Sequence, residues 1–169
     1  MVGVLSVVAA AIWYSLTDAG ILAFALPGVF APRFLGLRSG ADIVCSITLL
    51  VAAWSNVFDL YTSISWWDVL IHVVCTAVLA AVVHAWAAHL GVVSAPRETS
   101  LSVTVMVTAA IGLALSALWE MVEWFGYVAI TTDIYVTYHD TIGDMAAGGA
   151  GACAAGLLLR HMSLLRDQP

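Results

Sequence analysis

Long apolar segments separated by short polar connections make up most of this chain. Several apolar segments reach the roughly 20 residues that a helix needs to cross a bilayer. The pattern predicts five membrane-spanning helices, at about residues 2–25, 41–61, 66–90, 101–130 and 141–159. The dipeptide Pro27-Gly28 is expected to end the first of them. We therefore predict an all-α, polytopic transmembrane bundle that forms a single integral membrane domain over residues 1–169.

Composition agrees with this pattern and excludes one class of partner. Charged residues make up 9% of the chain and the mean hydropathy is +1.02, whereas about a quarter of the residues in a soluble domain are charged. There are no lysines and the five basic residues are all arginines, so nucleic-acid binding lacks an electrostatic basis. We expect the lipid bilayer to be the main surroundings of the protein.

The five arginines predict how the chain is oriented. Five spans would put the connection with Arg33 and Arg38, the connection with Arg97 and the tail with Arg160 and Arg166 on one side of the membrane. The positive-inside rule makes that side cytoplasmic. The N-terminus is then outside and the C-terminus cytoplasmic.

Acidic residues gather at the other ends of the last three predicted spans. They occur at helical spacings of three or four residues, which place each pair on one helix face: Asp68 with His72, Glu120 with Glu123, and Asp140 with Asp144, next to His139. Glu120 follows Arg97 by 23 residues and Asp140 precedes Arg160 by 20, about 35 and 30 Å of helix. The pairs are therefore expected at a similar depth near the outer surface.

Five carboxylates without an arginine on their side cannot all stay ionised unless a cation joins them. Oxygen donors combined with imidazole suit Zn²⁺, Mg²⁺, Mn²⁺ or Fe. The predicted metal ligands are His72, Glu120, Asp140, Asp144 and His139, and the predicted catalytic bases are Glu123 and Asp68. Each pair alone is more typical of a solvated face or a helix cap, and Asp140 or His139 capping the last helix is the alternative interpretation.

Two further features lie inside predicted spans. Asp18 is expected near mid-membrane in the first helix, either as a hydrogen-bonded structural residue or in a functional role. Gly148, Ala152 and Gly156 continue the face of Asp144. Such a row of small residues lets a neighbouring helix approach closely.

Three motifs carry a family resemblance: WDVLIH with Asp68 and His72, WEMVEW with Glu120 and Glu123, and HDTIGDMAAGGAGA with Asp140 and Asp144. Together they resemble the YjdF-like family of bacterial inner-membrane proteins and, more distantly, VanZ-like proteins, which are associated with glycopeptide resistance. The resemblance covers about the last three helices. It implies a multi-pass protein of the bacterial cytoplasmic membrane whose six motif residues act as one set, and it names no reaction.

Three functions are compatible with these features. The first is a metal-dependent membrane enzyme of hydrolase type, which acts on a lipid or cell-envelope substrate. The second is cation- or proton-coupled transport or binding, which would require a homo-oligomer because five helices are few. The third is a small structural subunit that docks on another membrane protein through its small-residue helix face.

Overall fold

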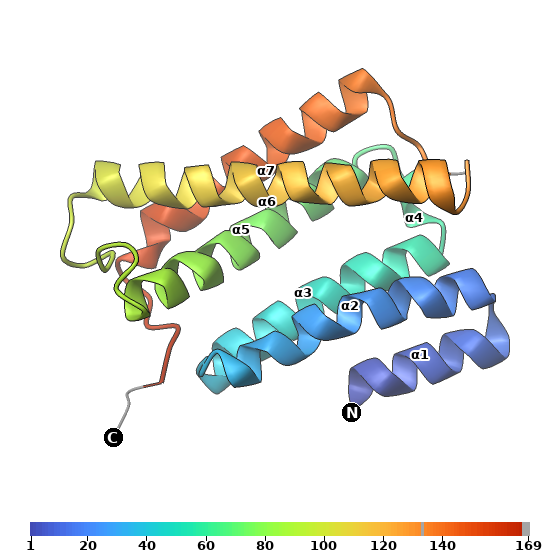
Figure 1. Cartoon of the computed structure of the whole chain (residues 1–169), viewed down its shortest axis with the longest axis horizontal. Coiled ribbons are helices and arrows are strands. Elements are labelled where there is room, and N and C mark those ends of the chain that lie inside the picture. Colours follow the sequence, from blue (N-terminus) through green and yellow to red (C-terminus); the bar gives the residue numbers. More distant parts are fainter. Residues whose placement is uncertain (133, 167–169) are drawn as a thin grey trace. The chain divides into compact units, whose positions relative to one another are not determined.

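The computed structural model describes residues 1–132 and 134–166, in which short connections join the helices and the one β feature is an isolated bridge between Leu37 and Leu165. Its helices are α1 (Val2–Trp13), α2 (Leu16–Phe34), α3 (Ser39–Val57), α4 (Leu60–Ser63), α5 (Trp67–His89), α6 (Leu101–Ala129) and α7 (Tyr138–Leu159) (Figure 1). In the described part of the chain, α3, α5, α6 and α7 are long and apolar enough to cross a membrane. The predicted helical membrane bundle is thereby confirmed.

The helices belong to two compact units. The first contains residues 1–67 and the described C-terminal residues from Ser163 onward, and the second contains residues 68–162. In the first unit the C-terminal segment returns to the connection between α2 and α3, where the Arg38 amide donates to the Leu164 carbonyl at 2.8 Å. The second unit contains α6, α7 and all of α5 except its first residue.

The prediction of one continuous helix over residues 2–25 is wrong. The chain reverses after Trp13, and α1 runs back along α2 (Figure 1). A capping box causes the break: the Ser15 hydroxyl accepts from the Asp18 amide, and the Asp18 carboxylate accepts from the Ser15 amide at 3.0 Å. Such reciprocal bonds satisfy amides that a helix start leaves unpaired. Asp18 is therefore a helix-start residue of α2 and does not lie in the middle of a span.

The helix does not end at Pro27-Gly28 as expected, because α2 continues through Pro27 and Pro32. Neighbouring helices make such prolines tolerable in membrane proteins. A Cβ on Gly28 would lie 2.7 Å from Leu49 of α3, which shows how closely α2 and α3 pack there. On α1, a Cβ on Gly3 would meet Leu26 of α2 at 2.9 Å. The orientation of the N-terminus across the membrane stays a prediction.

The expected helix at 41–61 is also divided. It begins earlier, at Ser39, and ends at Val57. Asp59 then adopts the left-handed conformation (φ 53°), which ends α3 and leads into the short α4. Aspartate is one of the few residues that tolerate this conformation. The last three predicted helices are present, and none of their ends is shifted by more than three residues.

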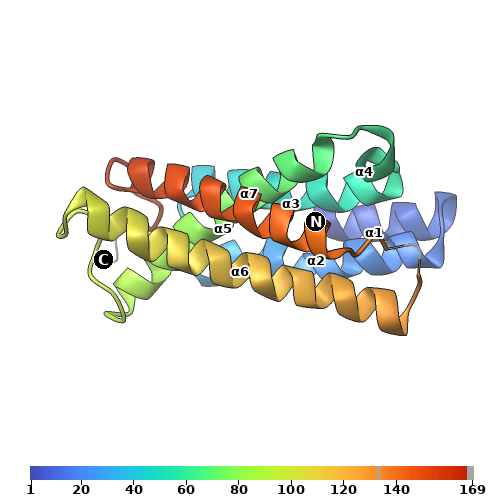
Figure 2. The ribbon, with the colours of Figure 1, turned by 90° about the horizontal axis from the view of Figure 1, so that it is seen from above.

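The second unit is held together by close packing of α5, α6 and α7. Residues four apart along the three helices form four successive layers. From the acidic end, the layers are His72, Glu120 and Asp144; Thr76, Ser116 and Gly148; Ala80, Gly112 and Ala152; and His84, Thr108 and Gly156, given in the order α5, α6, α7. A Cβ on Gly148 would overlap the Ser116 hydroxyl, and one on Gly112 would overlap the Ala152 methyl group. The small residues predicted to pack helices thus lie buried at their contacts. Figures 1 and 2 show α6 and α7 running antiparallel along each other.

Helix direction places charges at opposite ends of the second unit. The C-terminal half of α6, the first turn of α5 and the first two turns of α7 carry the clustered acids, whereas Arg97 precedes α6 and Arg160 follows α7. Asp144 and Arg160 are sixteen residues apart, about 24 Å of helix. The expected separation of the arginines from the clustered acids of the last three spans is therefore present within this unit, where, among the described residues, Glu98 beside Arg97 is the one acid at the arginine end.

Gly151→Ala tests the close packing. The new Cβ would overlap the Val73 backbone carbonyl of α5, which cannot rotate away. Overpacking of this kind costs about 1–3 kcal/mol, so we expect thermal unfolding in detergent at a clearly lower temperature. Gly143→Ala on the same helix is the control, because no atom lies within 4 Å of its Cβ and alanine favours helix. Equal unfolding temperatures for the two variants would contradict the packing.

Candidate functional site

His72 is the centre of the acidic cluster. It lies on the second turn of α5 with 7% of its surface exposed. Its Nε2 is 3.5 Å from Oδ1 of Asp68, one turn earlier on the same helix, and 3.9 Å from Oδ2 of Asp144 on α7. Asp144 is also buried, whereas Asp68 is one-third exposed. One imidazole nitrogen thus faces carboxylates from two helices.

The third helix adds a second group around the same imidazole. Ligand atoms of His72, Glu120 and Glu123 all lie within 4.8 Å of one another. Another group with the same spacing consists of Asp68, His72 and Asp144. His72 belongs to both, so α5, α6 and α7 all contribute to one cluster.

Glu120 is the most unusual member of the cluster. The residue is 6% exposed, and its Oε1 is buried without a hydrogen-bond partner in the described part of the chain. Buried polar atoms nearly always have a partner, and one that lacks it among protein atoms indicates strain, a functional role, or an ordered water or ion. One oxygen of the Glu120 carboxylate lies within 4.8 Å of a His72 ring nitrogen and of a Glu123 carboxylate oxygen. This carboxylate is therefore available as a ligand.

The cluster has an excess of negative charge. Four carboxylates surround a single imidazole, and the two arginines of this unit are at its opposite end. Two like charges at such separations repel strongly where little water is present. A metal ion would compensate this charge. Carboxylate oxygens and one imidazole form a donor set that suits Mg²⁺, Mn²⁺, Fe or Zn²⁺, so the residues present fit a divalent ion.

From the acidic cluster toward the arginine end of this unit, the interface between α5, α6 and α7 first contains hydroxyl groups and is then filled by tightly packed small side chains. Thr76 and Ser116 form a buried hydrogen bond of 3.4 Å. The next layer consists of Ala80, Gly112 and Ala152, where a Cβ on Gly112 would overlap the Ala152 methyl group. The site is therefore bounded on the side of the arginines by tight apolar packing.

Two predicted ligands lie outside both groups. Asp140 is in the first turn of α7, where a negative charge is favourable. Its amide donates to the Thr137 hydroxyl at 3.3 Å, so Thr137 caps this helix instead of Asp140 or His139. His139 is exposed, and the centroid of its ring lies 6.0 Å from that of the Tyr138 ring in an edge-to-face arrangement.

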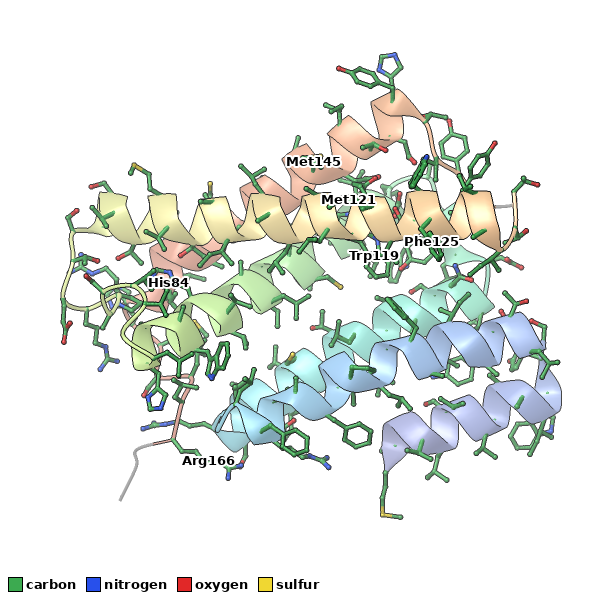
Figure 3. All side chains as sticks on the ribbon, in the orientation of Figure 1. His84, Trp119, Met121, Phe125, Met145 and Arg166 are labelled. Carbon is green, nitrogen blue, oxygen red and sulfur yellow. The ribbon has the colours of Figure 1, made fainter. Side chains whose placement is uncertain are left out.

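The stretch of α6 that carries the two glutamates has an apolar outer face. Met121 and Phe125 lie on it, four residues apart (Figure 3), and are 54% and 61% exposed. Side chains of this size are typical of a surface that contacts lipid. The acidic cluster is thus an inward-facing polar site on a helix whose other faces are apolar.

Several polar residues near the axis were not singled out by the sequence. Thr76 and Ser116 lie directly under the cluster, and His84 is 2% exposed. Its Nδ1 lies 2.8 Å from the Thr108 hydroxyl, which in turn donates to the Thr104 carbonyl at 2.7 Å. The four-residue spacing of polar and small side chains on α5 and α6 was the signal that could have identified them.

Comparison with known proteins gives a family and no function. No curated protein and no solved structure matches the chain. A family model described as "Predicted membrane protein (DUF2238)" matches residues 1–164. That match covers nearly the whole chain, including every residue of the cluster and all four helices that are able to cross a membrane. The protein therefore belongs to the DUF2238 family of predicted membrane proteins.

Proposed function

We propose that this protein is a metal-dependent membrane enzyme of hydrolase type, acting on a lipid or cell-envelope substrate. The observation that carries the proposal is the buried Glu120 carboxylate beside an imidazole shared by two ligand groups, with an Oε1 that has no hydrogen-bond partner among the described residues. A set of donors that is incomplete without a cation supports metal binding better than it supports a purely structural network.

In this proposal His72 holds the metal together with the most buried acid of either ligand group, Glu120 or Asp144. A bound divalent ion would supply Lewis acidity and an activated water. Asp68 and Glu123 are less buried, so one of them is suited to accept a proton from water at the rim of the site. Asp140 and His139 then lie at the entrance on the first turn of α7.

Two features favour chemistry at the site over transport along the axis of the second unit. A cation leaving the cluster toward the arginines would have to pass the closed layer of Ala80, Gly112 and Ala152. The mixture of imidazole and carboxylates also exceeds what a proton pathway needs. The exposed apolar face with Met121 and Phe125 supports a substrate that arrives from the lipid phase.

The narrower family, the cellular location and the substrate class belong to the same proposal. The resemblance of the three motifs to YjdF-like and VanZ-like proteins stays a prediction, as does the bacterial cytoplasmic membrane as the location. A cell-envelope substrate follows from that resemblance and from a lipid-facing site, and it is tested by the activity measurement below.

Metal affinity provides the first test. We expect His72→Gln to weaken Mn²⁺ binding to the detergent-solubilised protein by at least about tenfold, since even residues that merely orient ligands have effects of that size. The control is His139→Gln, an exposed histidine outside both ligand groups, which should bind as the wild type does. Titration calorimetry and elemental analysis measure both. A wild-type protein that binds no divalent metal would contradict the proposal.

Stability provides a second test because the effect of Glu120→Gln should depend on the metal. With a chelator present, we expect the variant to unfold at the same or a higher temperature than the wild type, since a buried charge is removed. With metal at about one hundred times Kd, the wild type should gain about 2.7 kcal/mol and the variant much less. The exposed Glu98→Gln should follow the wild type in both conditions. A variant that gains as much as the wild type would remove Glu120 from the ligand set.

Activity is tested in vesicles made from a bacterial membrane lipid extract. We expect the reconstituted, Mn²⁺-loaded protein to release water-soluble or de-esterified products that lipid mass spectrometry detects. Glu123→Gln should reduce the rate by about a hundredfold or more, which is the usual contribution of a general base. Undiminished turnover in that variant would exclude Glu123 as the base, and a metal-loaded wild type without any product would argue against a lipid hydrolase.

A further inference from the structure

A second candidate site lies at the arginine-bearing end of the same unit, away from the acidic cluster. It is a cavity of about 350 Å³, lined by Arg97, Leu101, Leu157, Arg160 and His161. The volume is within the range of about 300–1,000 Å³ that small-molecule pockets occupy. None of its lining residues belongs to the two ligand groups around His72.

The cavity is basic and its charges are uncompensated. The Arg97 Nε donates to the Arg160 main-chain carbonyl at 3.0 Å, which fixes the guanidinium at the end of α7. Its other N–H groups remain available. Within the described residues neither Arg97 nor Arg160 forms an ion pair, and the neighbouring Glu98 forms none either. Two guanidinium groups beside a histidine match a phosphate, which arginine binds through paired N–H donors.

The remaining lining is apolar. Leu101, the first residue of α6, is 42% exposed, and Leu157, near the end of α7, is 51% exposed. Both helices are long and apolar enough to cross a membrane, so these leucines lie where a spanning helix meets the membrane surface. The N-terminus of α6 adds a positive dipole end at the same place. Phosphate-binding and apolar groups therefore adjoin each other.

We propose that this cavity binds the phosphate headgroup of an anionic phospholipid, held by Arg97 and Arg160, with the acyl chains against Leu101 and Leu157. A soluble phosphate would use only the basic half of the lining and leave both leucines without a partner. The position fits as well, because basic pockets near helix ends on the side that carries the arginines attract anionic lipids. This site does not depend on the proposed enzyme activity.

Native mass spectrometry of the full-length protein tests the proposal. Protein released from detergent with added phosphatidylglycerol should retain one lipid, and with phosphatidylcholine much less. Arg160→Gln should lower retention about fivefold or more, the effect of one arginine near an anionic surface. The Arg160→Gln variant keeps the main-chain carbonyl that accepts the hydrogen bond from the Arg97 side chain. The matched control is Arg33→Gln, an arginine outside the cavity that lies 3.8 Å from Asp42, which should retain the lipid.

A second variant covers the case in which Arg160→Gln fails to fold. Leu157→Glu changes a half-exposed side chain and should lower retention similarly, because its charge repels the phosphate. Monodisperse elution establishes folding in each case. Equal retention of the two lipids, or equal loss in Arg33→Gln, would overturn the proposal. Complete displacement of the lipid by glycerol 3-phosphate at the same concentration would overturn it too, by showing a site for small anions.

Discussion

The close approach of α5, α6 and α7 is the constraint on which the rest of the second unit depends. Small residues at four-residue intervals let the helices meet so closely that a Cβ on Gly151 would overlap a main-chain carbonyl of α5. Because each helix carries acids or a histidine at one end of this interface, the same packing forces those side chains together. The acidic cluster is thus a consequence of backbone distance, and it would not form if the helices were separated by larger side chains.

The negative charge of the acidic cluster determines which ligands it is able to bind. Four carboxylates around one imidazole repel one another, and both arginines of the unit lie at the opposite end. The unpartnered oxygen of Glu120 shows that hydrogen bonds within the unit do not fully compensate this arrangement. A divalent cation would satisfy that oxygen and reduce the repulsion together, which is why metal binding explains more of the geometry than a structural role does.

Helical periodicity predicted the second unit better than the first. Spacings of three and four residues placed Asp68 with His72 and Glu120 with Glu123, and the small residues after Asp144 indicated a packing face. The break at Ser15 was missed because its capping partner, Asp18, is surrounded by apolar residues and resembles an intramembrane acid. Periodicity predicts which residues share a helix face, but it does not predict which other helix packs against that face. It could not separate Asp144, which contacts His72, from Asp140, one turn away and outside both groups.

Crystals grown with Mn²⁺ test the central claim most directly, through an anomalous difference map. We predict a peak within ligand distance of the His72 Nε2 and the Glu120 Oε1, between α5, α6 and α7. The same crystals of His72→Gln should lose this peak. A wild-type map without a peak at His72, or with manganese bound only by exposed acids elsewhere, would contradict the existence of a metal site in this bundle.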